Sequence, residues 1–182
     1  MEDLETEKRM HQLSNKSFHR KSEKLLINDS EVHNLLKSHF TPLFEELNIW
    51  MQSPFKSNPT YPDGLNCNSI SGHVLRSKSE CMIDMLLYES NIPFRYECEL
   101  TLNNHTIYPD FTIRHPRTGE LYYWEHFGMM DDPLYAKKAM SKLNLYIENQ
   151  IIPSINLITT YETKDHPLDL TQIKSIINYY FS

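Results

Sequence analysis

Two acidic residues, Asp110 and Glu125, stand in predicted strands of the segment 107–128, IYPDFTIRHPRTGELYYWEHFG. Residues 115–120 contain Pro and Gly and predict the turn between these strands. A regular antiparallel pair centred on this turn places Asp110 directly opposite Glu125, on one face of the hairpin. Like charges in that position destabilise a sheet, so the pair calls for a physical reason.

Three arrangements would relieve the repulsion between the two carboxylates. They could share a proton with one pKa raised, a basic side chain could neutralise them, or a divalent cation could bridge them. Hard oxygen ligands at this separation suit Mg²⁺, with Mn²⁺ as a substitute. A fourth interpretation, in which one acid faces solvent, requires no partner.

Two predicted helices carry further side chains that could face the same place. Glu80 lies at the border of an apolar helical stripe, so it can face the sheet or extend into solvent. In the helix 133–149, Lys142 lies on the inward arc, where burial of a lysine is costly unless an anion meets it. A snorkelling lysine is the alternative. The same arc carries one competing lysine and two supporting tyrosines: Lys138, Tyr135 and Tyr146.

The elements that would position these residues follow from hydrophobic periodicity and turn signals. From residue 73 the pattern predicts a helix, three strands, a helix, a strand and a closing helix. This order predicts an α/β domain over 73–182, with a mixed sheet of about four strands flanked by helices. Residues 1–72 are expected to form a helical N-terminal extension followed by a linker rich in Ser, Asn and Pro over 53–72.

The composition bears on the cellular location and the binding partners of this domain. No apolar run is long enough for a membrane span, and the charged N-terminus lacks the apolar segment of a secretory signal. The three cysteines, Cys67, Cys81 and Cys98, are scattered and odd in number, which favours free thiols and a cytoplasmic protein. The formal net charge of −6 argues against a protein that coats nucleic acid, although it is compatible with an enzyme that uses cations.

The motifs together resemble a known family. "YPDF", followed by "WEHFG" and preceded by "RSKSE", is similar to the PD-(D/E)XK nuclease superfamily, which has the restriction-endonuclease-like fold. The wording "YYWEHFGMMDDPLY" resembles small stand-alone bacterial members and the nuclease domains appended to some superfamily-one DNA helicases. The resemblance covers roughly residues 73–180 and matches the expected order of helices and strands.

The resemblance implies a Mg²⁺-dependent nuclease that hydrolyses phosphodiester bonds in DNA, with RNA as the other candidate substrate. Asp110, Glu125 and Glu80 match the family's metal-binding acids. The family lysine would stand two residues after Glu125, where this sequence has Phe127, so Lys142 is the candidate for a migrated lysine. The resemblance further suggests a helicase or a second copy as partner, and DNA repair or defence as the setting. The alternative is a catalytically inactive nucleic-acid-binding or assembly module on the same fold.

Overall fold

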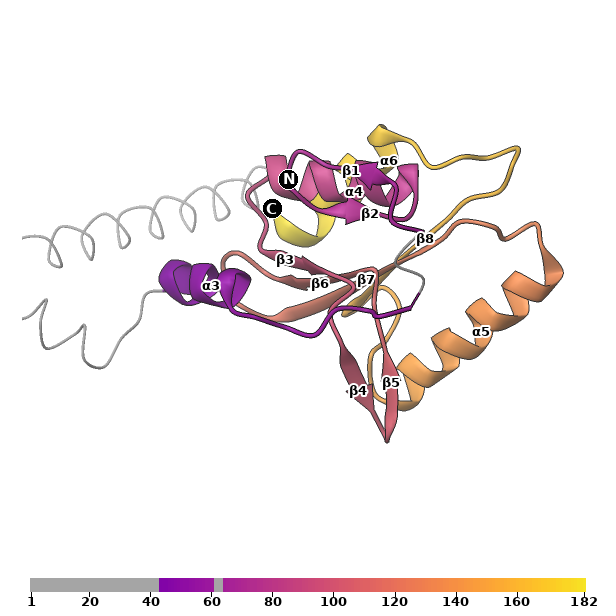
Figure 1. Ribbon diagram of the computed structural model, residues 1–182, viewed down its shortest axis with the longest axis horizontal. Helices are drawn as coiled ribbons and strands as arrows, with labels where there is room; N and C mark the ends of the chain where they lie inside the picture. Colours follow the sequence, from indigo (N-terminus) through magenta and orange to yellow (C-terminus); the bar gives the residue numbers. More distant parts are fainter. Residues whose placement is uncertain (1–42, 61–63) are drawn as a thin grey trace, which may run out of the picture. The chain divides into compact units, whose positions relative to one another are not determined.

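A computed structural model describes residues 43–60 and 64–182, and these belong to one compact unit, Leu43–Ser182 (Figure 1). Its elements in chain order are α3 (Leu43–Gln52), β1 (Cys67–Asn68), β2 (Val74–Leu75), α4 (Lys78–Glu89), β3 (Phe94–Tyr96), β4 (Leu100–Leu102), β5 (His105–Ile107), β6 (Phe111–Arg114), β7 (Leu121–Phe127), α5 (Pro133–Glu148), β8 (Leu157–Tyr161) and α6 (Leu170–Phe181). The expected α/β class is confirmed.

The central sheet has four strands in the order β3-β6-β7-β8. The pairs β3–β6 and β6–β7 are antiparallel, whereas β7 and β8 are parallel and are connected through α5. The sheet is therefore mixed, as predicted. Figure 1 shows α4 and α6 on one side of it and α5 on the other.

The compact unit begins earlier than the sequence suggested. We expected a boundary near residue 73, but the division lies between Pro42 and Leu43. Residues 43–60 pack against the β3 edge: Ser57 forms a β-bridge with Cys98, and the Arg95 guanidinium lies 4.4 Å from the centre of the Trp50 ring. Of the expected N-terminal helix, α3 is the part within the described residues, and the rest of that prediction lies outside them.

Side chains at the helix N-termini explain where the helices begin. Ser77 caps α4 and accepts from the Glu80 N–H, Asp132 caps α5 ahead of Pro133, and Asp169 caps α6. Each cap satisfies backbone N–H groups that have no partner inside the helix. Proline at the first position of α5 has no N–H to satisfy, which suits this start.

The register of the hairpin β6–β7 agrees with the sequence prediction. Phe111 pairs with Trp124, and Thr112 pairs with Tyr123, so continuing the ladder by one residue brings Asp110 to the position opposite Glu125. Gly119 adopts φ +73° in the connecting turn, a conformation that glycine accepts without strain. The turn composition therefore sets a register that fixes which side chains share a face.

The strand expected over "PFRYECEL" is interrupted at Glu97. β3 and β6 pair through Phe94 and Ile113, while β4 and β5 pair through Leu100 and Ile107. Leu100 lies six residues after Phe94 and Ile107 six residues before Ile113, so both pairs belong to one continuous register. Glu97 has φ +45°, and Pro109 on the facing strand has no N–H for the ladder. The long hairpin formed by β3 and β4 with β5 and β6 therefore bends at Glu97 and Pro109, and its outer part, β4–β5, leaves the central sheet.

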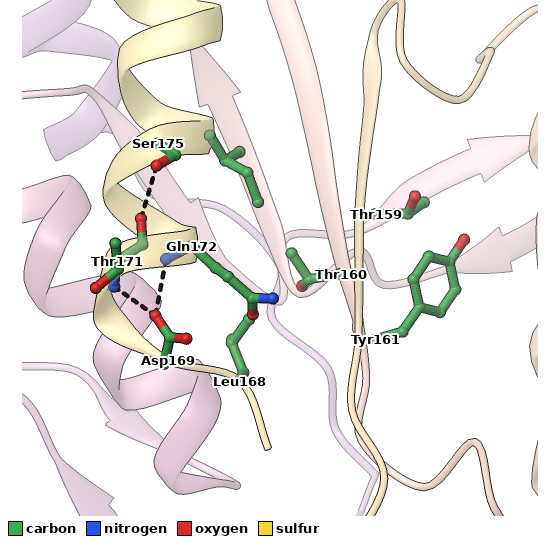
Figure 2. Close-up of a pocket in the computed structure, with 9 residues that line it drawn as sticks. Thr159, Thr160, Tyr161, Leu168, Asp169, Thr171, Gln172 and Ser175 are labelled. Atoms are coloured by element: carbon green, nitrogen blue, oxygen red, sulfur yellow. Dashed lines mark hydrogen bonds between the residues drawn. The ribbon is translucent and has the colours of Figure 1, made fainter. Parts of the chain in front are cut away.

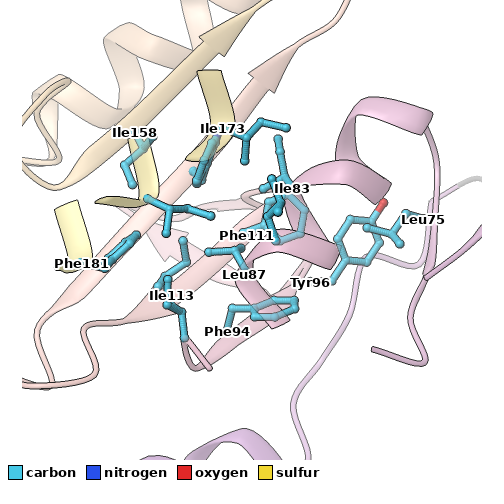
Figure 3. Packing of buried hydrophobic residues seen from close by; sticks show 14 of the residues in the cluster. Leu75, Ile83, Leu87, Phe94, Tyr96, Phe111, Ile113, Ile158, Ile173 and Phe181 are labelled. Atoms are coloured by element: carbon cyan, nitrogen blue, oxygen red, sulfur yellow. The ribbon is translucent and has the colours of Figure 1, made fainter. Parts of the chain in front are cut away.

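Two hydrophobic clusters lie on the two faces of the sheet. The larger is formed with α4 and α6, as Figure 3 shows, and its fully buried members include Leu75, Ile83, Leu87, Phe111, Ile113, Trp124 and Ile173. The second lies under α5 and includes Leu102, Tyr123, Phe127, Leu143, Tyr146 and Leu157. Alternate residues of β7 point to opposite faces of the sheet, so Trp124 packs in the first cluster and Tyr123 and Phe127 pack in the second.

Candidate active site

Glu125 lies on β7 toward α5 and is only 2% exposed. Two side chains of α5 contact its carboxylate. The Lys142 ammonium lies 2.7 Å from Oε1 and 2.8 Å from Oε2, and the Tyr146 hydroxyl donates to Oε1 at 2.6 Å. Lys142 and Tyr146 are four residues apart, so one helical face presents both to the sheet. Charge pairing and hydrogen bonds together make burial of this carboxylate tolerable.

Asp110 is half buried and directly precedes β6, at the bend where β4–β5 leaves the central sheet. Its Oδ2 accepts the backbone N–H of His126 at 2.6 Å, and its own carbonyl accepts the Glu97 N–H at 3.0 Å. The side chain therefore reaches across to the strand that carries Glu125. Burial and the nearby Glu125 charge raise the pKa of Asp110 well above its usual value.

Lys142 partly relieves the repulsion that the sequence predicted. Its ammonium also donates to the Tyr108 carbonyl at 3.1 Å, which fixes it at the root of the bent hairpin. Burial lowers the pKa of Lys142, but the carboxylates of Glu125 and Asp110 outweigh this effect and raise it, so the lysine is charged. The pKa of Glu125 nevertheless stays above its usual value because burial dominates over the lysine. Lys142 thus neutralises part of the negative charge. The environment still disfavours the ionised forms of Asp110 and Glu125.

Glu80 takes part in a different network. Its carboxylate accepts the Tyr96 hydroxyl at 2.6 Å and the Ser77 hydroxyl at 2.8 Å, which ties it to the start of α4. Its charge is close enough to raise the pKa of Asp110 and of Glu125. The charge of Glu80 therefore acts on the carboxylate pair, while its own hydrogen bonds join the start of α4 to β3.

The other supporting residues differ in their placement. The Tyr135 hydroxyl accepts the Gly128 N–H at 3.2 Å, and the charges of Asp110 and Glu125 contribute to raising its pKa after burial. Tyr146 is fully buried against Glu125. Lys138, the competing lysine, is exposed on α5. Asp110, Glu125, Lys142 and Tyr146 therefore form the central cluster, Tyr135 lies at its border and Lys138 is outside it.

Phe127, at the position where the family pattern has lysine, is 3% exposed and belongs to the second hydrophobic cluster. Its ring stacks on Tyr161, with centroids 5.4 Å apart. Phe127 points to the same face of β7 as Glu125 because the two residues are separated by two positions. An apolar side chain thus stands at position 127, and the amine beside Glu125 comes from α5.

Carboxylate oxygens are the groups here that could hold a cation. Among residues 43–60 and 64–182, no group of three or more His, Cys, Asp or Glu side chains is placed to bind a metal ion. A carboxylate offers about four lone-pair positions, and Lys142 and Tyr146 use part of those of Glu125. Two oxygen donors whose pKa values are raised by burial fit a hard divalent cation, whose charge would stabilise their ionised forms.

Two backbone groups of the site had no signal in the sequence. They are the His126 N–H, which holds Asp110, and the Tyr108 carbonyl, which holds Lys142. Every residue carries such groups, so residue types do not identify them. Pro109 was the one available indication, because a proline within a strand pattern marks a break in the ladder.

His126 faces away from Glu125, as strand alternation predicted. Its Nδ1 lies 3.0 Å from the Thr160 hydroxyl, and its Nε2 lies 3.4 Å from Glu162 Oε1. Glu162 also accepts the Ser79 hydroxyl at 2.8 Å and the Leu168 N–H at 3.1 Å. This polar cluster lies on the α4 and α6 side and links β7, β8 and α4.

A cavity of about 470 Å³ is lined by residues of β8 and α6 and does not include Asp110 or Glu125 in its lining (Figure 2). Hydroxyl and amide side chains line much of it, among them Thr159, Thr171, Gln172 and Ser175. Its one acid, Asp169, accepts the N–H groups of Thr171 and Gln172 and so serves as the cap of α6. The cavity therefore has no group placed for acid–base or metal chemistry.

Comparisons with known proteins give little functional information. No protein-family model matches the chain, and no solved structure matches it significantly. An uncharacterized protein of Methanocaldococcus jannaschii is 27% identical over 132 residues, which are 68% of this chain and 11% of that protein. The chain thus spans about a tenth of the length of this relative. Within the described ranges, no helix is long and apolar enough to cross a membrane.

Proposed function

We propose that the protein is a divalent-metal-dependent nuclease with a restriction-endonuclease-like core and DNA as its substrate. The observation that carries this proposal is the placement of Lys142, seventeen residues after Glu125 in sequence, in contact with both Glu125 oxygens. Two acids and one lysine at one site match the set of residues that the sequence resemblance implies. The sequence resemblance and the mixed four-stranded sheet support the same assignment.

Each residue of the cluster has a role in this proposal. Asp110 and Glu125 would hold Mg²⁺ or Mn²⁺, which supplies an acidified water nucleophile and stabilises charge on the phosphate. Tyr146 and the His126 N–H hold the two carboxylates in fixed orientations, so little reorganisation is needed when substrate arrives. Lys142 places a positive charge beside Glu125, where it can orient the attacking water or stabilise the phosphorane-like transition state.

Lys142 would take the role of the lysine that the family places two residues after the second acid. Phe127 fills that position with an apolar ring, while the α5 helix delivers an ammonium to the same carboxylate. Glu80 contributes negative potential from α4, and Tyr135 and Tyr146 keep the α5 side of the site in place. The resemblance further suggests a helicase or a second copy as partner, and a cytoplasmic setting.

A second function is a catalytically inactive nucleic-acid-binding or assembly module. The observation that favours it is that both oxygens of Glu125 already accept hydrogen bonds, from Lys142 and Tyr146. In such a module, Lys142 would be a permanent structural counterion in place of metal. The net charge of −6 agrees with a protein that does not rely on non-specific contacts with phosphates.

Cleavage of supercoiled plasmid, linear duplex, single-stranded DNA and RNA distinguishes the two functions. The parent protein is incubated with Mg²⁺, with Mn²⁺ or with EDTA, beside Glu125→Gln, which keeps the side-chain shape, and Glu120→Gln as an exposed acid of the same hairpin. The nuclease assignment predicts metal-dependent cutting of DNA by the parent and by Glu120→Gln, and none by Glu125→Gln. Absence of cutting with every metal and substrate would leave the binding module as the function.

A further inference from the structure

The bent hairpin carries an arm, residues 100–107, that no step of the proposed chemistry uses. β4 and β5 form a separate two-stranded sheet that projects from the central sheet on the side of α5 (Figure 1). Its inner side chains Leu100, Leu102 and Ile107 pack in the cluster under α5. The arm is thus held against the domain, and its orientation relative to the carboxylate pair is fixed.

The outer side and the tip of the arm present uncharged polar groups. Thr101 and Thr106 form a cross-strand pair, and the tip continues through Asn103, Asn104 and His105. All five residues are exposed. Within the described part of the chain, none of their side chains makes a hydrogen bond or an ion pair. The arm therefore offers a row of donors and acceptors, all available to a ligand.

The tip is a two-residue turn. Asn103 and Asn104 adopt φ of +44° and +68°, the left-handed conformation at both central positions of a two-residue hairpin turn. Asparagine and glycine are the residues that take this conformation most readily. Two asparagines are consequently adjacent at the end of the two-stranded ribbon.

Composition indicates the kind of partner. Residues 100–108 contain no Asp, Glu, Lys or Arg, in a chain that has 24 acids and 18 bases. None of the arm residues is a large exposed hydrophobic, so the surface lacks the apolar and aromatic anchors on which protein partners usually depend. Without Lys or Arg, the arm also brings no positive charge to phosphates. Neutral amides and hydroxyls suit the edges of bases.

Shape and position favour the major groove of duplex DNA. That groove admits a two-stranded β-ribbon, and asparagine pairs with the N6 and N7 of adenine there. The root of the arm joins Asp110 through residues 107–109, and the Tyr108 carbonyl holds Lys142. Asn104 lies six residues from Asp110, hence at most about 20 Å along the strand, which corresponds to roughly six base pairs of duplex.

We propose that the arm enters the major groove beside the cleavage site and reads bases there through Asn103 and Asn104. This inference rests on the proposed function, because it takes DNA as the substrate of the carboxylate site. It adds a source of sequence preference that the acids and the lysine do not provide. Adenine is the base that the amide pair would select.

The arm is tested by replacing both asparagines with glycine, Asn103→Gly and Asn104→Gly, which removes the amides while the turn conformation remains accessible. The control is Asn91→Gly, because Asn91 is also exposed and has φ +53°. All variants are made in full-length Asp110→Asn protein, which prevents cutting. Affinity for an A·T-rich duplex of about three helical turns is measured by fluorescence anisotropy across a salt series.

Loss of the arm contacts should weaken duplex binding about tenfold or more, with the salt dependence unchanged because no phosphate contact is removed. Replacing adenine by 7-deaza-adenine should weaken binding of the Asp110→Asn parent and leave the glycine double variant unaffected. Equal affinity of the double variant and the Asn91→Gly control would overturn the proposal, as would an effect of 7-deaza-adenine that persists without the amides. Binding is measured without cleavage, so the proposal for the arm can fail while the nuclease assignment stands, and the reverse.

Discussion

Acids on the two faces of the central sheet lie in opposite environments. On the α4 and α6 side, burial alone would raise the pKa of Glu162, but hydrogen bonds from Ser79 and the Leu168 N–H outweigh it and hold the pKa below its usual value. On the α5 side, the pKa values of Asp110 and Glu125 are raised, although Lys142 and Tyr146 contact Glu125. The neighbours of Glu162 stabilise its ionised form, whereas the surroundings of Asp110 and Glu125 disfavour theirs.

This difference separates structural acids from functional candidates. An acid whose ionised form is stabilised by its neighbours contributes to folding, as Glu162 does between α4 and β8. A pair whose ionised forms are disfavoured reduces stability, and such pairs occur where a ligand later provides the missing charge. The contrast leads to predictions of opposite sign for the two faces.

Addition of Mg²⁺ should produce the largest effect on stability. A cation that binds only the folded protein stabilises it by about 2.7 kcal/mol at a hundred times its dissociation constant, which raises the melting temperature by several degrees. Differential scanning fluorimetry of the parent and of Asp110→Asn measures this effect. The variant should show no response, and an unchanged melting curve of the parent at millimolar metal would remove the cation from the account.

Removal of Glu162 should cost about 2 kcal/mol, because Ser79 and the Leu168 N–H would then lack their acceptor. Urea denaturation of Glu162→Ala measures this loss. The control is Glu148→Ala, an exposed acid of α5, which should leave stability unchanged. Equal stability of both variants would show that the cluster around Glu162 is not structural.

Asp110→Asn should change the stability of the metal-free protein in the opposite direction. It removes a carboxylate held beside Glu125 and should raise the free energy of unfolding by about 1 kcal/mol at neutral pH. Urea denaturation in EDTA provides the measurement, with Glu162→Gln as the matched amide substitution on the other face. A loss of stability on Asp110→Asn would place Asp110 among the structural acids.

The smallest effect concerns pH. The pKa of Asp110 is higher in the folded than in the unfolded state, so the folded protein binds a proton that the unfolded chain releases. Stability should therefore fall as pH rises above the pKa of an aspartate in the unfolded chain, and Asp110→Asn should flatten this dependence. Glu162 has a lowered pKa, so its contribution is present above the unfolded pKa and is lost only as pH falls through the folded value. Identical pH profiles of the parent and Asp110→Asn would contradict this assignment.

Much of the site was predictable because it depends on periodicity. The Pro- and Gly-containing turn set the register that brings Asp110 opposite Glu125, and helical spacing placed Lys142 and Tyr146 on one face of α5. The same spacing left Lys138 as a competitor, which the structure shows to be exposed. A small difference in helical angle decides between neighbouring lysines, and sequence resolves such differences poorly.

The bend of the hairpin and the role of Glu80 were harder to foresee. Glutamate has no preference for the left-handed conformation that Glu97 adopts, so alternation predicted one straight strand. Glu80 stays a predicted metal ligand, and its contacts with Ser77 and Tyr96 were not foreseen because they depend on how α4 sits against β3. Tertiary placement of this kind has no local signature. The start of the compact unit at Leu43 was missed because the Ser- and Pro-rich segment reads as a linker.

The central claim is that Lys142 supplies the amine of a metal-dependent nuclease. Plasmid cleavage by Lys142→Ala tests it most directly, beside Lys138→Ala, which removes an exposed lysine one turn earlier on α5. Both variants are compared with the parent in Mg²⁺ after circular dichroism has verified folding. The account predicts a loss of at least about a hundredfold in rate for Lys142→Ala and the parent rate for Lys138→Ala. Cleavage by Lys142→Ala at the parent rate would contradict it.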